Sequence, residues 1–399
     1  MPAMPRTTPV VLLFAALSFA PAASGEETIR LVSSLPRTGS ANAQTSTIVN
    51  GIRLAIEDAG GAVAGFKLAY EDWDDASPER GAWDPAVEAA NAAKAVNDPD
   101  VMAYIGTYNS GAAKIAMPRL NQAGLLMISP ANTAVGLTKP GLGENTEPAC
   151  YRPSGQVTYF RVVPADDLQG DLGAAWAKEL GAKKVFVLHD KEAYGKGLGE
   201  VFKASAPKYG IKIVGFEGID LKAANYRSLV TKIRAADPQA VYFGGTTQSN
   251  AGQIAKDLTA AGLKLPFIVP DGCLENAFIE SAGAAALEGR TYITFGGVPP
   301  ERLTGKGAEF VTRYVKRFNA QPEAYAVYGY ECAAVVIDGI RRAGKKDRGA
   351  ITAAVRATKD FAGALGTWSF DANGDISLRT VSVNTVKDGK FSFVKVLGQ

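Results

Sequence analysis

Small polar residues follow two apolar runs between residues 104 and 133, and their positions are those of a ligand-binding turn. Asn109 or Ser110 is placed to cap a helix that begins near residue 111, so the first N–H groups of that helix stay free. Ala131, Asn132 and Thr133 follow the next run, at the end of a strand where open α/β sheets bind ligands. Because a helix N-terminus favours an anion, this pattern predicts a site for a small carboxylate. The alternative is an ordinary βαβ unit whose caps only complete the helix.

A carboxylate that could bind the opposite charge lies much later in the chain. Asp271 follows an apolar strand and sits between Pro270 and Gly272. It is one of few acids near the strand ends of the second half, together with Asp190 and Glu217. An ammonium group would suit it, although a turn aspartate that caps its own loop has the same pattern.

Residues for catalysis or metal binding are scarce. Ser110 or Ser129 could act as a nucleophile only with His189, the one histidine of the chain, and Ser110 lacks a G-x-S-x-G elbow. His189 beside Asp190 is expected to be a structural residue at a strand end. The chain contains no C-x-x-C, H-E-x-x-H or Walker A pattern, so we predict no metal, no cofactor and no enzymatic activity.

The N-terminal residues predict export from the cytoplasm. Arg6 precedes an apolar run from Val10 to Ala20, and small residues follow up to Gly25, which together indicate a signal peptide over residues 1–25. Cleavage is expected after Gly25 or after Ser24. The run is about half of the roughly twenty residues that a membrane span requires, so the mature protein is expected not to be membrane-embedded. A formal net charge of only +3 gives no reason to expect nucleic acid as a partner.

From residue 28 onward, strand and helix patterns alternate in two runs of similar length, which predicts an α/β protein with two doubly wound parallel-sheet lobes facing a cleft. Lobe I is expected to contain residues 26–165 and 296–377, and lobe II residues 166–295 and 378–399, with three hinge crossings. A helical stretch is expected over 310–343 and two C-terminal strands near 380–385 and 391–396. Residues 136–153 form a long loop that either borders the site or is a surface excursion. The three cysteines allow at most one disulfide.

Several short stretches, in shared order and spacing, give the chain a resemblance to a known family over essentially its whole mature length. They are Pro36–Gly39, Ile105-Gly106 with Ser110, Leu126–Ala131 with Thr133, Val187–Lys191 with Tyr194–Gly197, Tyr242–Gly245 and Pro270–Gly272. The chain resembles the leucine/isoleucine/valine-binding proteins, which are the solute receptors of branched-chain amino acid ABC transporters. This resemblance implies the type I periplasmic binding protein fold.

The resemblance also implies roles for individual residues. Ser110 and Thr133, with nearby main-chain N–H groups, would hold the carboxylate of a ligand. The carbonyl of Ala131, together with Thr133 and Asp271, would take the ammonium, and Tyr194 would approach from the second lobe. This assignment agrees with the anion and cation sites predicted from the residues themselves.

The chain departs from the family pattern at three places. Thr246 stands where relatives carry an aromatic ring, Asn109 occupies a position that is cysteine in some relatives, and the loop over 136–153 is longer. Thr246 is nevertheless expected in the pocket.

These observations together predict a monomeric periplasmic receptor that binds a small amino acid, branched-chain or otherwise aliphatic, and delivers it to the permease subunits of an ABC transporter. The alternatives are a receptor for an aromatic acid or urea, or a hydrolase that uses Ser110 and His189.

Overall fold

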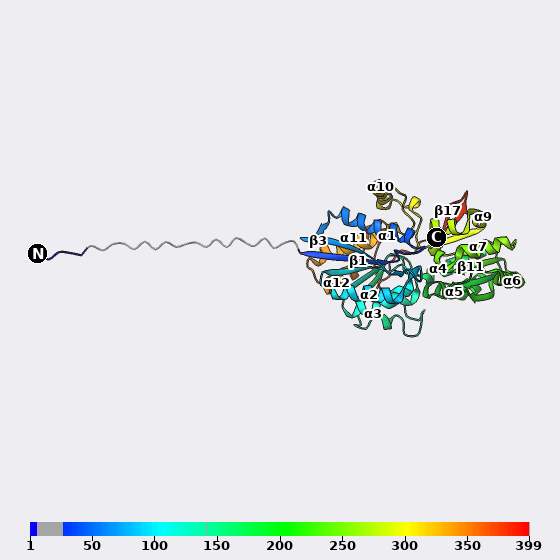
Figure 1. The fold of residues 1–399 in the computed structure, drawn as a ribbon, viewed down its shortest axis with the longest axis horizontal. Helices are drawn as coiled ribbons and strands as arrows, with labels where there is room; N and C mark the ends of the chain where they lie inside the picture. Colours follow the sequence, from blue (N-terminus) through cyan, green and yellow to red (C-terminus); the bar gives the residue numbers. More distant parts are fainter. Residues whose placement is uncertain (6–26, 142, 399) are drawn as a thin grey trace.

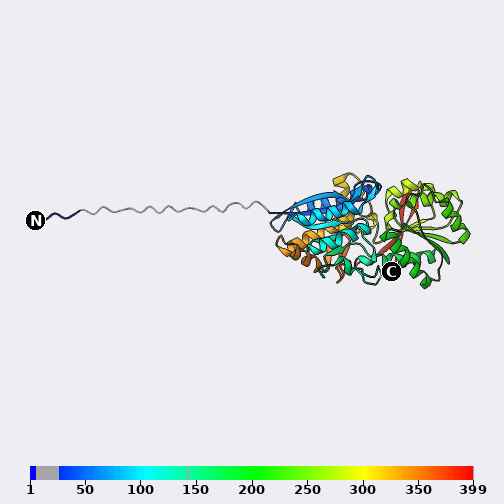
Figure 2. The ribbon, with the colours of Figure 1, turned by 60° about the horizontal axis from the view of Figure 1, so that its bottom comes forward.

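The structure is a computed structural model that describes residues 1–5, 27–141 and 143–398. The apolar run and the cleavage site of the predicted signal peptide lie outside these residues. Two α/β lobes lie side by side, one with the blue, cyan and orange segments and one with the green, yellow-green and red segments (Figures 1 and 2). In the described part of the chain, no helix has the length and apolarity needed to cross a membrane.

The first lobe is built on a six-stranded sheet that is parallel except for its first edge strand. The order is β2 (Ala62–Val63), β3 (Phe66–Asp74), β1 (Thr28–Leu35), β6 (Val101–Gly106), β7 (Leu126–Ser129) and β8 (Tyr159–Arg161). Strands β6 and β7 are buried at every position, because helices cover both faces of a parallel sheet. Leu31 points to the core under helices α1 (Asn42–Asp58) and α11 (Ala326–Ala343), and Val32 to the core under α2 (Pro85–Asn97) and α3 (Ser110–Gln122).

The second lobe is built on a seven-stranded sheet. Its order is β10 (Lys212–Gly218), β9 (Lys184–His189), β11 (Ala240–Gly244), β12 (Phe267–Val269), β13 (Thr291–Phe295), β16 (Val381–Lys387) and β17 (Lys390–Leu397). The first five strands are parallel, and β16 and β17 form the antiparallel C-terminal hairpin that the sequence predicts. Helices α4 (Asp166–Glu179) and α5 (Ala193–Ser205) cover one face. The other face carries α6 (Arg227–Ala236), α7 (Ala251–Ala260), α8 (Asn276–Ala282) and α9 (Ala284–Leu287).

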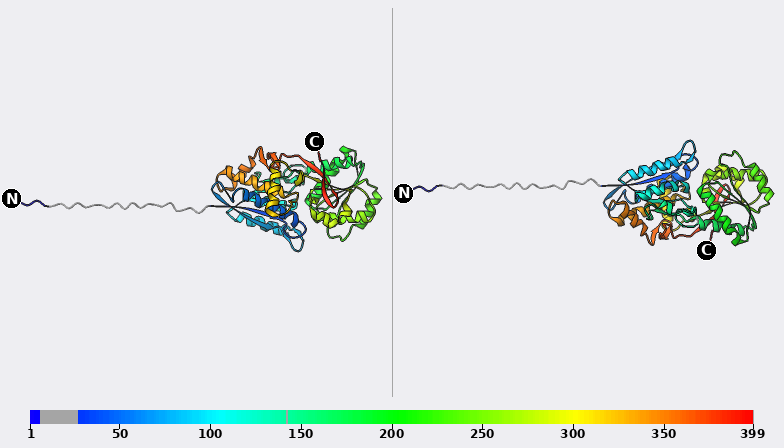
Figure 3. Two further views of the ribbon diagram at one scale, coloured as in Figure 1. Left: turned by 90° about the horizontal axis from the view of Figure 1, so that it is seen from above. Right: turned by 90° about the horizontal axis from the view of Figure 1, so that it is seen from below.

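The chain passes between the two sheets three times, after β8, after β13 and before β16 (Figure 3). The boundaries expected near residues 165, 295 and 378 fall in these connections, and as exact positions they stay a prediction. In the second connection, the Tyr328 hydroxyl donates a hydrogen bond to the carbonyl of Gly296 (2.6 Å). Gly297 has φ +128°, and a Cβ there would lie 1.9 Å from the same hydroxyl, so glycine is required.

One expectation about the elements is wrong. The stretch 310–343 is not one helix but two, α10 (Lys306–Phe318) and α11, because Asn319 ends α10 in the left-handed conformation and Pro322 follows three residues later. Strand β3 continues to Asp74, and a short hairpin of β4 (Ala76–Ser77) and β5 (Ala82–Trp83) follows it. Helix α12 (Arg348–Arg356) and the hairpin of β14 (Phe361–Gly363) and β15 (Gly366–Trp368) complete the first lobe.

Candidate ligand-binding site

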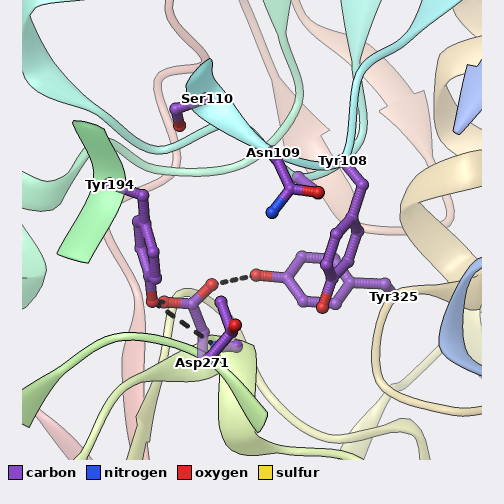
Figure 4. Close-up of a pocket in the computed structure, with 9 residues that line it drawn as sticks. Tyr108, Asn109, Ser110, Tyr194, Asp271 and Tyr325 are labelled. Atoms are coloured by element: carbon purple, nitrogen blue, oxygen red, sulfur yellow. Dashed lines mark hydrogen bonds between the residues drawn. The ribbon is translucent and has the colours of Figure 1, made fainter. Parts of the chain in front are cut away.

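A cavity of about 280 Å³, which we call the inner chamber, lies where the carboxyl ends of the strands of the two lobes meet (Figure 4). The first lobe contributes the turn between β6 and α3, the turn after β7 and the residue before α11. The second lobe contributes the start of α5 and the turns after β11 and β12. The lining residues are Tyr108, Asn109, Ser110, Ala131, Tyr194, Thr246, Asp271, Gly272 and Tyr325.

The first-lobe wall of the chamber can bind an anion. Helix α3 begins at Ser110, so its first free N–H groups lie at this wall. The Ser110 Oγ accepts a hydrogen bond from the N–H of Ala134 (3.3 Å), which leaves the hydroxyl hydrogen available for a ligand. Asn109 occupies the N-cap position, as predicted, but its side chain makes no capping hydrogen bond.

The second-lobe wall carries Asp271, which is 3 % exposed. Its carboxylate accepts hydrogen bonds from Gln169 Nε2 (2.6 Å), from the Tyr194 hydroxyl (2.7 Å) and from the Tyr325 hydroxyl. Burial raises the pKa of Asp271, while these three hydrogen bonds act in the opposite direction. All three donors are neutral, so a cationic group of a ligand would be the missing charge partner.

A second buried carboxylate makes this region still more favourable for a cation. Asp166 lies at the start of α4 and is 1 % exposed. Burial, followed by the charge of Asp271, raises the pKa of Asp166. Two carboxylates that disfavour each other's ionisation are both stabilised by one positive charge nearby.

The structure brings together five of the seven residues predicted for the site, which are Ser110, Ala131, Tyr194, Thr246 and Asp271.

Asn132 and Thr133 do not line the inner chamber. The Asn132 amide donates to the carbonyl of Tyr108 (3.0 Å) and accepts from the Tyr159 hydroxyl (3.2 Å), so its side chain is used inside the first lobe. Thr133 is fully buried, and its carbonyl accepts a hydrogen bond from the N–H of Asp166 (2.9 Å). A direct contact of either side chain with a ligand stays a prediction.

Three residues of the site were not singled out from the sequence. Tyr325 lies in a segment expected to be helical throughout, although Pro322 just before it marks the helix break that frees it. Tyr108 stands in the turn after β6, and its ring meets that of Tyr325 edge-on at 5.9 Å between centroids, a contact that no local pattern indicates. Gln169 lies in the first turns of α4, and nothing local indicates that it reaches Asp271 across 102 residues of sequence.

The long loop does not line the inner chamber. Residues between 135 and 147 line a separate cavity between the lobes, together with residues of α5. The loop contains two single turns of 3-10 helix, at Val135–Leu137 and Ala149–Tyr151.

The groups considered for catalysis are not assembled. His189 packs its ring against Phe216 (4.9 Å), and its Nδ1 accepts from the N–H of Lys191 (3.1 Å). Burial lowers the pKa of His189. Ser129 donates to the carbonyl of Thr107 (2.9 Å) and lies in the first lobe.

The described residues contain no cluster of three or more His, Cys, Asp or Glu side chains suited to a metal ion. All three cysteines are free, with Cys273 and Cys332 buried and Cys150 exposed.

A chamber closed by two α/β lobes, with an anion-binding helix end on one wall and a buried carboxylate on the other, defines a two-lobed receptor for a small solute. Comparison with known proteins gives the family. The chain belongs to the periplasmic binding protein family, whose sequence profile matches residues 28–390.

Individual relatives are similar over most of their length. The Leu/Ile/Val-binding protein homolog 2 of Brucella abortus is 32 % identical over 364 residues, which cover 90 % of this chain and 91 % of that protein. The branched-chain amino acid transporter substrate-binding protein LivJ of Streptococcus pneumoniae, solved in complex with isoleucine, is 26 % identical with a TM-score of 0.80 and covers 93 % and 99 % of the two chains. These relatives share the type I periplasmic binding protein fold.

The same fold occurs in a more distant protein with a different ligand. A solute-binding protein of an ABC transporter from R. palustris, solved in complex with benzoate, is 20 % identical with a TM-score of 0.76. The alignment covers 92 % of this chain and 96 % of that one. The likeness concerns the fold alone, so the choice of ligand has to be argued from the chamber.

Proposed function

We propose that this protein is the periplasmic substrate-binding component of an ABC transporter, and that it binds a small α-amino acid between its lobes and delivers it to the permease. The relatives named for leucine, isoleucine and valine make the aliphatic amino acids the first candidates. In this proposal the chain acts as a monomer after export and catalyses no reaction.

The observation that carries this proposal is the carboxylate of Asp271, which is buried among neutral donors opposite the N-terminus of α3. An α-amino acid places an ammonium and a carboxylate on one carbon, so it complements both walls at once. The Tyr325 hydroxyl, from the first lobe, donates to the same carboxylate. Ligand binding and closure of the two lobes would therefore use the same group.

A carboxylic acid without an ammonium group, such as an aromatic acid, is the second candidate because a protein of this fold binds benzoate. Such a ligand would leave Asp271 without a cation, and the carboxyl would then have to bind a proton at neutral pH. Its binding should therefore strengthen as the pH falls, whereas that of an amino acid should not.

The proposal is tested with purified mature protein freed of bound ligand by partial unfolding and dialysis. Thermal-shift and calorimetric titrations should compare leucine, isoleucine and valine with 4-methylpentanoate, benzoate and urea. We expect at least one α-amino acid to bind, with stabilisation of about 2.7 kcal/mol at a hundred times its dissociation constant. Binding of benzoate or urea with no response to any amino acid would refute the proposal.

Delivery and location need separate measurements. Deletion of the gene should abolish high-affinity uptake of the amino acid that binds in vitro, and the protein should fractionate with the periplasm. Elution as a monomer in size-exclusion chromatography is the expected oligomeric state.

A further inference from the structure

The inner chamber adjoins a larger, open cavity, the outer chamber, which lies between the same lobes and has a volume of about 1370 Å³ including the solvent at its mouth. Four wall residues are common to both cavities, namely Asn109, Ser110, Tyr194 and Thr246. We call these four residues the collar. A ligand held by its α-ammonium and α-carboxylate in the inner chamber could extend past the collar into the outer chamber.

Every collar residue has a hydrogen-bonding side chain, and that of Asn109 is not satisfied within the protein. Its Oδ1 is buried and accepts no hydrogen bond from the residues that the structure describes. The carboxamide lies above the inner chamber, with its nitrogen toward Asp271 and its oxygen on the side of Tyr108 and Tyr325 (Figure 4). Because buried polar atoms are nearly always paired, a donor of the ligand is expected at this oxygen.

The small side chain of Thr246 leaves space for a ligand at the collar. Its Oγ1 lies 3.1 Å from the Ser249 Oγ, which donates to the Asp190 carboxylate (2.7 Å), so the hydroxyl belongs to a polar network. A Cβ at Gly272 would lie 2.7 Å from the Thr246 Cγ2, which shows that the threonine is closely packed from behind.

The outer chamber has walls of mixed character. Trp83 contributes an aromatic surface, with the Arg80 guanidinium 5.6 Å from its ring centroid. Lys222 adds a second cation, while Glu79, Asp190 and Glu192 supply carboxyl groups. Since both signs of charge are present, these walls favour a neutral polar group over a charged one.

We infer that the ligand carries a neutral hydrogen-bonding group of the amide kind at the collar, either a side-chain carboxamide or a peptide bond that continues into the outer chamber. An amide offers both a donor for Asn109 Oδ1 and an acceptor for Asn109 Nδ2. This inference rests on the proposed function. The α-ammonium and α-carboxylate, held in the inner chamber, determine which part of the ligand's side chain lies at the collar.

The test compares L-glutamine with L-norleucine, which has the same chain length and no polar group, by calorimetry. Glutamine should bind at least about tenfold more tightly, the equivalent of one satisfied buried hydrogen bond. Asn109→Ala should reduce this preference to less than about threefold. Thr246→Tyr should weaken the binding of glutamine by about tenfold or more and leave the binding of alanine unchanged. The larger side chain closes the opening without touching the amino and carboxyl groups of the ligand.

Asn225→Ala is the matched control, because this exposed asparagine lies on the second lobe and lines neither chamber. Norleucine binding as tightly as glutamine in the native protein would overturn the inference and leave the amino acid proposal intact. Equal weakening of both ligands by Asn109→Ala would also overturn it, because Asn109 would then serve the shared ammonium. If no α-amino acid binds at all, both the inference and the proposed function fail.

Discussion

Replacing Asp271 by asparagine removes the negative charge of the inner chamber and changes almost no volume. The native carboxylate accepts hydrogen bonds from Gln169, Tyr194 and Tyr325. The amide oxygen of asparagine can still accept from two of these donors, so the closed arrangement of the lobes should persist. The substitution therefore tests the charge of the side chain and not its size.

Binding of an α-amino acid to Asp271→Asn should be weaker by about 3 to 5 kcal/mol, because removing one partner of a buried ion pair leaves the other charge uncompensated. At about 1.4 kcal/mol per decade, the dissociation constant should rise roughly a hundredfold to a few thousandfold. The free energy of unfolding should respond differently. Burial raises the pKa of Asp271, so its ionised form costs stability in the ligand-free protein at neutral pH. The variant should then be as stable as the native protein or more stable.

Isothermal titration calorimetry at pH 7 with leucine and with its des-amino analogue, 4-methylpentanoate, measures the effect. Only leucine should lose affinity. Asp257→Asn is the matched control, because Asp257 is a buried acid of the second lobe that accepts from the N–H of Tyr226 (2.6 Å) and lines neither chamber. An unchanged dissociation constant for leucine, or an equal loss for both ligands, would refute the ammonium role of Asp271.

Four further predictions follow from the same contacts. Tyr325→Phe removes the hydrogen bond that joins the lobes through Asp271, and calorimetry should show a dissociation constant raised by about ten- to a hundredfold, with tyrosine-to-phenylalanine changes away from the cleft as controls. Burial raises the pKa of Glu275 to about 8, so the folded protein holds a proton that the unfolded chain loses near pH 4.5. Glu275 should therefore contribute a fall of up to about 3 to 5 kcal/mol in the free energy of unfolding as the pH rises from about 4.5 to 8, and Glu275→Gln should reduce the pH dependence by that amount in denaturant titrations. His189→Gln should leave affinity within about tenfold, and loss of all binding in a natively folded variant would contradict its structural role. Saturating ligand should reduce the radius of gyration in solution scattering, whereas an unchanged radius would mean that the free protein is already closed or that one lobe holds the whole site.

The fold could be predicted from the sequence because the apolar pattern and the caps of each strand or helix lie within that element. Apolar runs such as that of β6 are continuous where both faces of a parallel strand are buried, and helices such as α2 follow with their own caps. The prediction failed over 310–343 because apolar periodicity continues on both sides of the break at Asn319. Propensity alone does not show where one helix ends and the next begins.

The chemistry of the inner chamber was also partly determined by the sequence. Ser110, Ala131 and Asp271 each follow an apolar strand, and parallel strands bring their carboxyl ends to one edge of a sheet. Residue type and position along the chain were therefore enough to predict an anion site and a cation site. They could not show which neighbouring side chains turn inward, and Asn132 turns into the first lobe instead.

Only the tertiary structure decided how the two sites combine. Tyr325 reaches Asp271 from 54 residues away and from the other lobe, and Asp166 and Gln169 join it from the start of α4. The collar between the inner and outer chambers likewise consists of residues from both lobes. The sequence determined which residues stand at the strand ends, because periodicity and turn chemistry are local. The partners of Asp271 and the opening beyond Thr246 were decided by the packing of one lobe against the other, a long-range property that no local pattern contains.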